Sequence, residues 1–178
     1  MLADRSIFTQ LDAHDRALFA RCALAVDKSS ATASRLWGAV THLGGLTSTV
    51  SAAMIPLLFF GELVRNAAQR ALVALAVSHV IVLLVKRFVG RSRPSDAMAW
   101  QSLVDPPACF SFPSGHATAS SAVAFVYSTY FPALAFPLMA LALTIGFSRV
   151  RLGVHYPGDV LAGQCIAIVV GLVTIALW

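Results

Sequence analysis

Residues 148–178 read SRVRLGVHYPGDVLAGQCIAIVVGLVTIALW, a polar segment that leads into an apolar one. The apolar part, residues 160–178, carries no charged side chain, and a helix of about 20 largely apolar residues is long enough to cross the hydrocarbon core of a bilayer. Pro157 suits the first position of that helix, where the missing N–H costs no intrahelical bond. The stretch therefore predicts a membrane-spanning helix whose polar N-terminal end lies at the membrane surface.

Four further apolar stretches precede it, at residues 37–60, 67–85, 117–131 and 133–147. The last two are short, since about 15 residues at 1.5 Å each cover only about 22 Å of a core that is ~30 Å thick. We expect them to extend further or to lie where the bilayer is thin. The predicted fold class is all-α, a polytopic bundle of about five transmembrane helices. Residues 1–178 are expected to form one domain, with a transmembrane core over 35–178, because neither half alone would bury a sizeable core.

The composition supports a membrane protein. The chain is 58% hydrophobic and 12% charged, with a mean hydropathy of +0.77, far from the balance of an ordinary soluble domain. Its net charge of +5 comes from cations dispersed among apolar stretches, a pattern that does not indicate nucleic acid as a partner. Cys22, Cys109 and Cys165 stand far apart, which predicts neither a disulfide framework nor a zinc site. We interpret them as small apolar side chains.

Residues 1–34 are expected to form an amphipathic N-terminal segment. Their early charges do not fit a cleavable signal peptide, so the mature chain is expected to begin near Met1. Apolar residues fall near helical spacing with charged residues between them, and the apolar ones are Phe8, Leu11, Leu18, Phe19 and Cys22. This pattern predicts a helix that lies in the membrane interface. The alternative is a helix that enters the membrane with its polar face packed in the bundle.

Polar residues gather at the ends of the predicted spans. They are Lys86, Ser114, His116, Arg149, His155 and Asp159. Because successive spans run antiparallel, all of these ends lie at the same membrane face, where they could converge on one pocket. Ionisable residues near the membrane core are costly and usually functional. For each Lys or Arg alone, the alternative is an interfacial anchor that reaches to water.

The chemistry of these side chains indicates phosphoryl transfer. Asp159 falls in the first turn of a helix, where the helix dipole favours the ionised carboxylate. A carboxylate beside His155 can fix the tautomer of the imidazole and make its other nitrogen a better nucleophile. Charges alone do not assign the roles of the two histidines, but the nearby Asp159 favours His155 as nucleophile and leaves His116 as the acid that protonates the leaving oxygen.

Cations and helix ends provide candidates for phosphate binding. Lys86 and Arg93 flank Arg87 and Arg91, and arginine can bind two phosphate oxygens at once. The amides from Ser114 to His116 could face an anion at a helix N-terminus. No cluster of carboxylates resembles a magnesium site, so neither a metal nor another cofactor is expected.

Three motifs together carry a family resemblance. Residues 86–94 match Lys, six residues, Arg-Pro; residues 113–116 are Pro-Ser-Gly-His; and residues 148–159 match Ser-Arg, five residues, His, three residues, Asp. In this order and at helix ends, they resemble the motifs of the type 2 phosphatidic acid phosphatase family, whose fold is shared with vanadium haloperoxidases. The resemblance implies that His155 forms a phosphohistidine, that Asp159 orients it and that His116 protonates the leaving group. It also implies phosphate-binding residues, namely Lys86, Arg93, Ser114, Gly115 and Arg149.

The function implied is a lipid phosphate phosphatase. Its substrates would be phosphatidate, phosphatidylglycerol phosphate or a polyprenyl phosphate or diphosphate, with membrane lipids as its surroundings. Two alternatives stay open, a vanadate-dependent peroxidase in the same pocket and a non-catalytic membrane scaffold or lipid carrier. We expect a multi-pass protein of a bacterial inner membrane. The distribution of positive charge places the site in the cytoplasm if five spans are right, whereas the resemblance favours the extracytoplasmic face. The oligomeric state is left open.

Overall fold

The structure is a computed structural model that describes residues 2–25, 30–59, 61–98, 100–105 and 110–178. Every regular element in these ranges is a helix, which confirms the predicted all-α class. In chain order the helices are α1 (Leu2–Cys22), α2 (Ala31–His42), α3 (Leu46–Phe59), α4 (Glu62–Val89), α5 (Pro94–Ala97), α6 (Gly115–Tyr130), the 3-10 turn η1 (Pro132–Leu134), α7 (Ala135–Arg151) and α8 (Pro157–Leu177).

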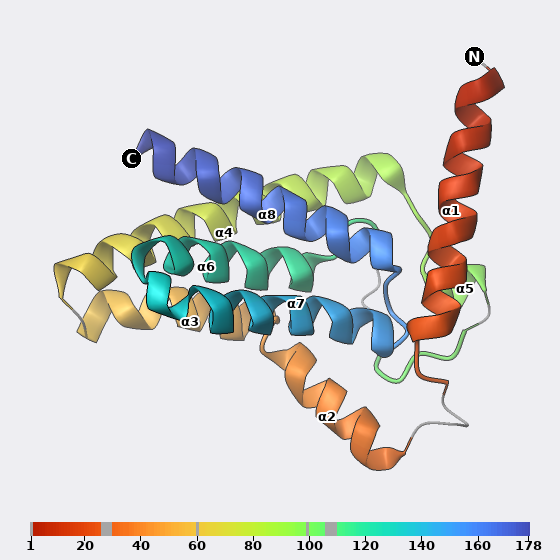
Figure 1. Cartoon of the computed structure of the whole chain (residues 1–178), viewed down its shortest axis with the longest axis horizontal. Helices are drawn as coiled ribbons and strands as arrows, with labels where there is room; N and C mark the ends of the chain where they lie inside the picture. The colour runs from red at the N-terminus through yellow and green to blue at the C-terminus, as the bar shows by residue number, and fades with distance from the viewer. Residues whose placement is uncertain (1, 26–29, 60, 99, 106–109) are drawn as a thin grey trace.

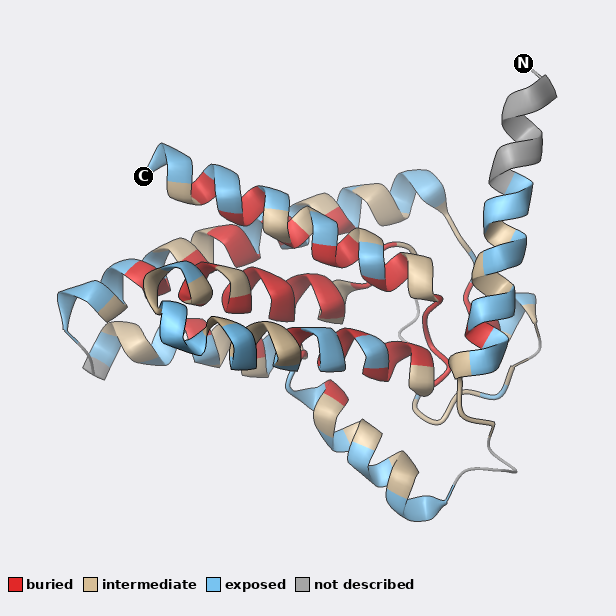
Figure 2. Cartoon of the chain, viewed as in Figure 1, coloured by how far each residue is buried: buried red, intermediate tan, exposed pale blue. Residues whose placement is uncertain are grey.

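Helix α6 forms the centre of the bundle. Helices α4, α7 and α8 run lengthwise beside it (Figure 1) and all three pack against it. Most of α6 between Ala117 and Tyr127 is buried, as Figure 2 shows. A helix that is buried on every side belongs to the interior of a helical protein. The body of α6 is therefore enclosed by its neighbours, and only Gly115 and His116 at its N-terminal end are partly exposed.

Small side chains let α4 and α6 approach closely. On α4, Ala67, Ala71 and Ala74 are fully buried, and they belong to the same apolar cluster as the fully buried Ala122 of α6. Without a hydrophobic driving force between helices in lipid, close packing of small residues is a main source of helix association. This packing fixes α4 beside α6 and brings the C-terminal end of α4 to the N-terminal end of α6.

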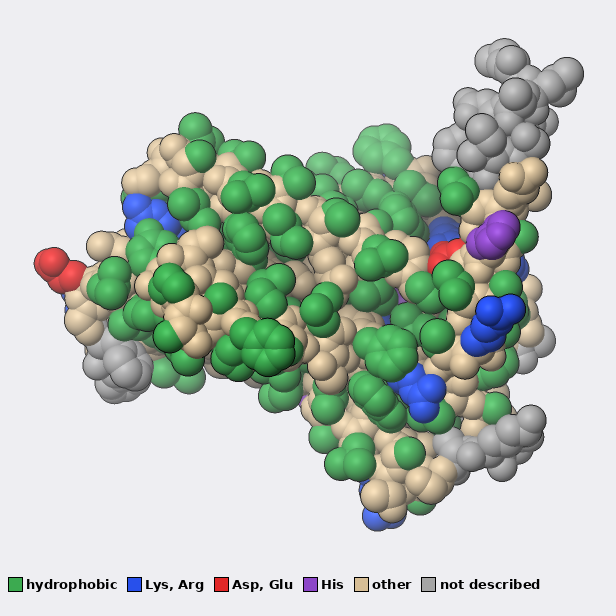
Figure 3. Space-filling model, in the orientation of Figure 1, with side chains coloured by type: hydrophobic (Ala, Val, Ile, Leu, Met, Phe, Trp, Pro, Cys, Tyr) green, Lys and Arg blue, Asp and Glu red, His purple; other side chains and the backbone are tan. Residues whose placement is uncertain are grey.

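Large apolar side chains cover the outside of the bundle. Leu58, Phe136 and Leu177 are 72%, 84% and 83% exposed, and Figure 3 shows hydrophobic side chains across the visible face with charged ones toward the two ends. A soluble monomer rarely exposes so much contiguous apolar surface. The surface is the kind that faces lipid tails.

Three described helical segments are long and apolar enough to cross a membrane, Glu62–Ala97, Pro132–Arg151 and Pro157–Leu177. Helices α3 and α6 have only 14 and 16 residues. The predicted spans over 67–85, 117–131, 133–147 and 160–178 fall on α4, α6, α7 and α8 respectively. The membrane character of the bundle is as predicted, but the number of five spans is not confirmed.

The predicted span over residues 37–60 is wrong as one continuous helix. The chain ends α2 at His42, turns through Leu43, Gly44 and Gly45, and begins α3 at Leu46. A Cβ atom on Gly44 would clash with a side chain of α7, so the glycine lets this turn press against the bundle. Apolar residues continue on both sides of the turn, which is why hydropathy alone does not reveal it.

Helix α1 crosses the end of the bundle where α8 begins (Figure 1). Leu11 and Leu18 are exposed, whereas Phe19 is fully buried and packs edge-on against Trp100 and Tyr156. This orientation places an apolar face outward and directs Asp12 and Asp15 toward Arg91 of the bundle, whereas Arg21 is exposed. The expected boundary at residue 34 falls inside α2, which already begins at residue 31; the single domain over 1–178 stays a prediction.

Candidate active site

Four helix ends and the segments between them meet at the α1 end of the bundle (Figure 1). A cavity of about 340 Å³ lies between them. Six of the predicted site residues line this cavity: Lys86, Arg93, Gly115, His116, Arg149 and His155. The structure therefore brings together residues that are spread over three motifs. The other two predicted residues, Ser114 and Asp159, lie next to this group but do not line the cavity.

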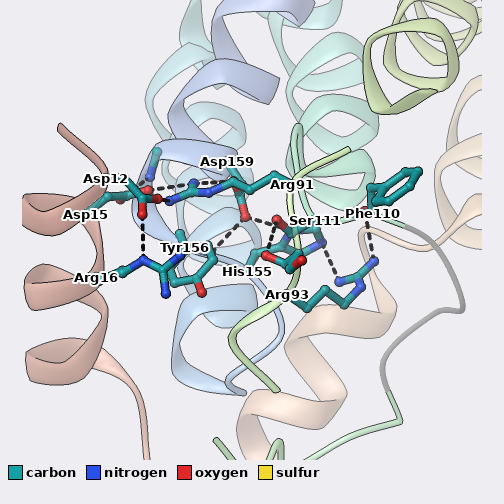
Figure 4. Close-up of polar contacts among 12 residues, drawn as sticks. Asp12, Asp15, Arg16, Arg91, Arg93, Phe110, Ser111, His155, Tyr156 and Asp159 are labelled. Atoms are coloured by element: carbon teal, nitrogen blue, oxygen red, sulfur yellow. Dashed lines mark hydrogen bonds and ion pairs between the residues drawn. The ribbon is translucent and has the colours of Figure 1, made fainter. Parts of the chain in front are cut away.

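The imidazole of His155 lies between Asp159 and the cavity (Figure 4). Its Nδ1 is 3.3 Å from Asp159 Oδ2, which also accepts a hydrogen bond from the backbone N–H of Tyr156 at 2.9 Å. His155 and Asp159 are 2% and 0% exposed. With the proton on Nδ1, the Nε2 atom keeps its lone pair. That atom lies 3.4 Å from Nη1 of Arg93.

Burial and two cations keep this imidazole neutral. Burial lowers the pKa of His155 to about 4, and the charges of Arg149 and Arg93 also lower it, although the hydrogen bond and charge of Asp159 act in the opposite direction. A nitrogen nucleophile must be unprotonated to attack. At neutral pH, His155 is in the form that a nucleophile needs.

Arg149 is a buried cation with unused hydrogen-bonding capacity. It lies in the last turn of α7, is 3% exposed, and donates from Nη1 to Thr41 Oγ1 at 2.7 Å. Its Nε has no hydrogen-bond partner among the described residues, and none of their carboxylates forms an ion pair with it. A buried charge without a counter-charge is costly. An oxyanion in the cavity would supply both the charge and the acceptor.

Lys86 and Arg93 lie at the cavity and also hold its walls together. The Nζ of Lys86 donates to the carbonyl oxygens of Phe110 and Ser111 at 2.5 and 3.4 Å. Arg93 donates from Nη1 to the carbonyl of Val154 at 2.7 Å and from Nη2 to that of Phe110 at 3.4 Å. Each cation thus joins segments that are distant in sequence while its charge remains beside the cavity.

The N-terminal end of α6 matches the prediction only in part. The amide of Ser114 donates to the carbonyl of Asp159 at 2.9 Å, so the prediction that this amide faces an anion is wrong. It instead joins α6 to the first turn of α8. Gly115 begins α6 and lines the cavity, and the first N–H groups of a helix have no intrahelical acceptor. Gly115 is therefore the better placed of the two for an anion.

His116 lies on the first turn of α6 and lines the same cavity as His155. The turn between α2 and α3 packs beside it, because a Cβ atom on Gly45 would lie 3.9 Å from His116 Nε2. Thr41, just before that turn, holds Arg149. Sequence reasoning missed this contribution because it placed the two glycines inside a helix.

Arg91 is the predicted phosphate-side cation whose position differs most from the prediction. Its position between Lys86 and Arg93 predicted a cation suited to a phosphate, but Arg91 does not line the cavity. It lies on the opposite side of Asp159 and forms ion pairs with Asp12, Asp15 and Asp159, each at 2.7 Å (Figure 4). Two of these partners lie more than 70 residues away on α1. No local pattern in the sequence signals such a contact.

Within the described ranges, no three His, Cys, Asp or Glu side chains form a group that could hold a metal ion; the expectation that no metal is required stays a prediction. Cys22 and Cys165 are free thiols. Cys165 is exposed on the apolar outside of α8 and does not lie in the core. The weakly polar thiol is tolerated on such an apolar surface as well. Cys109 lies outside the described residues.

The fold and the site define a class of helical membrane proteins in which histidines and several cations line one cavity. Within that class the chain belongs to the PAP2 superfamily, whose family model matches residues 67–178. The match includes all three sequence motifs and helices α6 to α8 in full. The family resemblance noted from those motifs is thereby confirmed.

Relatives in sequence carry phosphatase names. The chain is 42% identical over 98 residues to a decaprenylphosphoryl-5-phosphoribose phosphatase of Mycobacterium tuberculosis, which covers 54% of this chain and 53% of the relative. A protein of that name from Mycolicibacterium smegmatis is 36% identical over 133 residues, with 70% and 68% covered. The undecaprenyl-diphosphatase BcrC of Bacillus subtilis is 35% identical over 92 residues, with 52% and 48% covered. The match to the Mycobacterium tuberculosis relative thus spans about half of its length.

Solved structures share the fold at lower identity. Aquifex aeolicus LpxE superimposes with a TM-score of 0.77 at 23% identity, over 89% of this chain and 93% of that one. A PAP2-type phosphatidylglycerolphosphate phosphatase from Bacillus subtilis gives 0.73 at 22%, over 94% and 86%. A bacterial vanadium-dependent iodoperoxidase gives 0.61 at 18%, over 88% and 41%. These likenesses bear on the fold alone.

Proposed function

We propose that this chain is a membrane phosphatase that hydrolyses the phosphomonoester or diphosphate of a lipid through a phosphohistidine intermediate, without a metal. One observation carries the proposal most directly. The neutral imidazole of His155 is oriented by Asp159 at one nitrogen, and its other nitrogen lies beside a cavity that is also lined by Arg149, a buried guanidinium that forms no ion pair with any described carboxylate. A nucleophile next to a buried cation suits attack on a phosphoryl group.

In the first step, Nε2 of His155 attacks phosphorus and a P–N bond forms. The bond between phosphorus and the leaving oxygen breaks, and His116 donates a proton to that oxygen. The leaving group is a lipid alcohol for a monoester and a lipid monophosphate for a diphosphate. Arg149 and Arg93 stabilise the charge on the equatorial oxygens, while Asp159 stabilises the positive charge that develops on His155.

In the second step, water attacks the phosphorus of the phosphohistidine. The P–N bond breaks, which returns the electron pair to His155, and the water proton passes to the now neutral His116. Inorganic phosphate leaves, and both histidines regain the protonation states with which the cycle began. The same acid and base serve both steps, as the symmetry of the reaction requires. Lys86 and the N-terminal end of α6 at Gly115 would hold the phosphate throughout.

An apolar groove next to the cavity favours a lipid over a soluble phosphate ester. The groove has a volume of about 370 Å³ and lies between α3, α6 and α7, with Leu43, Ala52, Val123 and Ile145 among its lining residues. Its end at Ser120 is one turn of α6 from His116. Phosphatidate, phosphatidylglycerol phosphate and polyprenyl phosphates or diphosphates all combine a long apolar tail with a phosphate-containing headgroup. The names of the three sequence relatives described above favour the polyprenyl-linked compounds.

A panel assay tests this function. Purified protein in detergent with EDTA would be offered a polyprenyl phosphate, a polyprenyl diphosphate, phosphatidate, phosphatidylglycerol phosphate and a soluble phosphate ester. We expect release of phosphate from at least one lipid, faster than from the soluble ester, and loss of that activity in His155→Ala. Full activity in His155→Ala, or activity that disappears with EDTA, would overturn the proposal. Halide oxidation with vanadate and without phosphate release would instead identify a peroxidase.

We place the protein in a bacterial cell membrane with the site on the extracytoplasmic face. Asp96 lies exposed on α5 at the end of the bundle that carries the site, and Glu62 begins α4 at the opposite end (Figure 1). In a background in which all three cysteines are replaced, Asp96→Cys should react with an impermeant maleimide on intact cells and Glu62→Cys only after lysis. The reverse pattern would place the site in the cytoplasm.

A further inference from the structure

Helix α1 contributes charged side chains to the far side of the candidate active site. Arg91 lies between α1 and Asp159, with 18% of its side chain exposed. We propose that Arg91 is a positioning residue that holds the Asp159 carboxylate in place for His155, and that Asp12 and Asp15 of α1 hold Arg91. This inference rests on the proposed function, because it concerns the residue that orients the nucleophile.

Both oxygens of the Asp159 carboxylate are engaged. Oδ2 lies 3.3 Å from His155 Nδ1 and accepts from the backbone N–H of Tyr156 at 2.9 Å, while Oδ1 accepts from Arg91 Nη1 at 2.7 Å. A carboxylate held at both oxygens cannot rotate about its Cβ–Cγ bond without losing a charged contact. The direction of the hydrogen bond to His155 therefore depends on Arg91 as well as on Asp159.

The guanidinium of Arg91 is itself fixed from α1. Its Nη1 also donates to Asp15 Oδ2 and its Nη2 donates to Asp12 Oδ1, each at 2.7 Å. Its plane lies over the Tyr156 ring, with Cζ 4.0 Å from the ring centroid. Asp15 reaches further, because its Oδ1 accepts from the backbone N–H of Gly158 in the first turn of α8 at 2.7 Å. These contacts leave the cation little freedom.

A purely structural role, in which Arg91 only fastens α1 to the bundle, is the competing explanation. Other contacts also join α1 to the bundle. Phe19 is buried between Trp100 and Tyr156, and Nη1 of Arg151 donates to the carbonyl of Cys22 at the end of α1 at 2.7 Å. Neither of these reaches the carboxylate of Asp159. Arg151 is therefore a matched control for Arg91, since it joins the same helix to the bundle without touching the site.

The charge distribution gives the two explanations different consequences. Charged and titratable groups surround Asp159 and the groups bonded to it. They come from α1, the α4–α5 segment, α6, α7 and the segment before α8, and they are Asp12, Asp15, Arg16, Arg91, Arg93, His116, Arg149, His155 and Tyr156. Of the arginines in this group, Arg91 is the one in direct contact with the carboxylate. When a carboxylate loses the cation that contacts it, its pKa rises. When the cation instead loses acidic groups that neutralise it, the cation acts more strongly on the carboxylate, and the pKa of the carboxylate falls.

The first test compares kcat and KM of Arg91→Gln and Arg91→Lys with wild type over a pH series, on the lipid phosphate that the wild type hydrolyses fastest. We expect Arg91→Gln to lower kcat at least tenfold with KM changed less than twofold, because the substrate does not contact this residue. The acid limb of its kcat profile should move to higher pH by roughly one unit. Arg91→Lys should restore the position of the acid limb but only part of kcat, since an ammonium cannot reach three carboxylates in one plane.

The second test removes the partners on α1. Asp12→Asn/Asp15→Asn leaves Arg91 with less neutralisation, so the acid limb should move to lower pH, opposite to Arg91→Gln, while kcat falls several-fold. Arg151→Gln should leave the profile of the wild type unchanged. The inference fails if Arg91→Gln and Arg151→Gln behave alike, or if both site variants shift the limb in the same direction. If Arg91→Gln does not fold, the opposite shift in the α1 double variant still decides.

These results are separable from the proposed function. Loss of phosphate release in His155→Ala and its presence in wild type test the reaction itself. If wild type is inactive on the whole panel, the proposed function has failed. If wild type is active, dependent on His155 and insensitive to Arg91→Gln, only the present inference is overturned.

Discussion

Arg91 and Arg93 stand two residues apart, yet they lie on opposite sides of His155 and have opposite surroundings. Arg93 lies at the cavity, beside Nε2 of His155, and donates to backbone carbonyls. Arg91 lies behind Asp159 and meets three carboxylates. Lys86, Arg93 and Arg149 thus line the cavity side, whereas on the far side Arg91 is paired with carboxylates of the protein.

This contrast explains how one imidazole can be both neutral and ready to become positive. On the cavity side, the charges of Arg149 and Arg93 favour the neutral ring. In the proposed reaction these cations would attract the phosphate, and the carboxylate of Asp159 on the far side would stabilise the imidazolium that forms once Nε2 is bonded to phosphorus. Two arginines only two positions apart thus have different roles, because they contact different segments of the fold.

The largest loss of activity is expected at His155, which lies between the cavity side and the far side. Replacing His155 by Ala removes the proposed nucleophile, so kcat should fall by roughly 10⁴-fold or more. Phosphate release in detergent measures this loss, with the exposed His14→Gln on α1 as a histidine control that keeps wild-type activity. A residual rate near that of wild type would show that His155 is not the nucleophile.

A smaller but still large effect should follow from weakening the cavity side alone. Arg149→Lys keeps the positive charge but loses the planar fork that can bind two oxygens, and removal of such a donor typically costs about 10²-fold in kcat or more. Arg70→Lys at the opposite end of the bundle, where Arg70 donates to the carbonyl of Trp178 at 2.7 Å, is the matched control. Equal activities of the two variants would show that Arg149 does not act on the phosphate.

The close packing of α8 against the N-terminal part of α6 can be tested at Gly163. A Cβ atom there would lie 2.6 Å from Thr118 Oγ1 and 2.7 Å from the carbonyl oxygen of Ser114. Gly163→Ala should therefore push α8 away from α6 and lower the free energy of unfolding by about 1–3 kcal/mol. Thermal unfolding in detergent measures it. Gly38→Ala, where the new Cβ meets nothing within 4 Å, should unfold at or above the wild-type temperature.

The smallest effect concerns the pH dependence of stability. The pKa of His155 is lowered to about 4 in the folded protein, whereas an unfolded histidine titrates near 6.5. Between these values the unfolded chain binds a proton that the folded chain does not, so stability falls as the pH drops. From pH 6.5 to 5 we expect wild type to lose roughly 1–2 kcal/mol more than His155→Gln. Parallel unfolding curves for both proteins would contradict this.

The sequence predicted most of the bundle because the physics of membrane spans is local. The apolar runs over 67–85 and 160–178 correctly indicated α4 and α8, and antiparallel succession placed their polar ends together. The turn at Gly44 and Gly45 was missed because apolar residues flank it on both sides. A change in chain direction within an apolar run leaves no mark on hydropathy.

The candidate site shows a similar division. His155 and Asp159 are four residues apart at a helix start, so their contact follows from local geometry. The contacts of Arg91 with Asp12 and Asp15 and of Arg149 with Thr41 join positions far apart in sequence, and they depend on how α1 and α2 dock. Charge type alone could not distinguish Arg91 from Arg93, because that distinction belongs to the tertiary structure.

The most direct test of the account is to trap the covalent intermediate. Wild-type protein and His155→Gln would be mixed with a ³²P-labelled lipid phosphate that the panel assay identifies as a substrate, and quenched in alkali within one turnover. We predict label on the wild-type chain, stable to alkali and labile to acid, in the peptide that contains His155, and none on His155→Gln. Turnover by wild type without any labelled protein, or label on His155→Gln, would contradict the account.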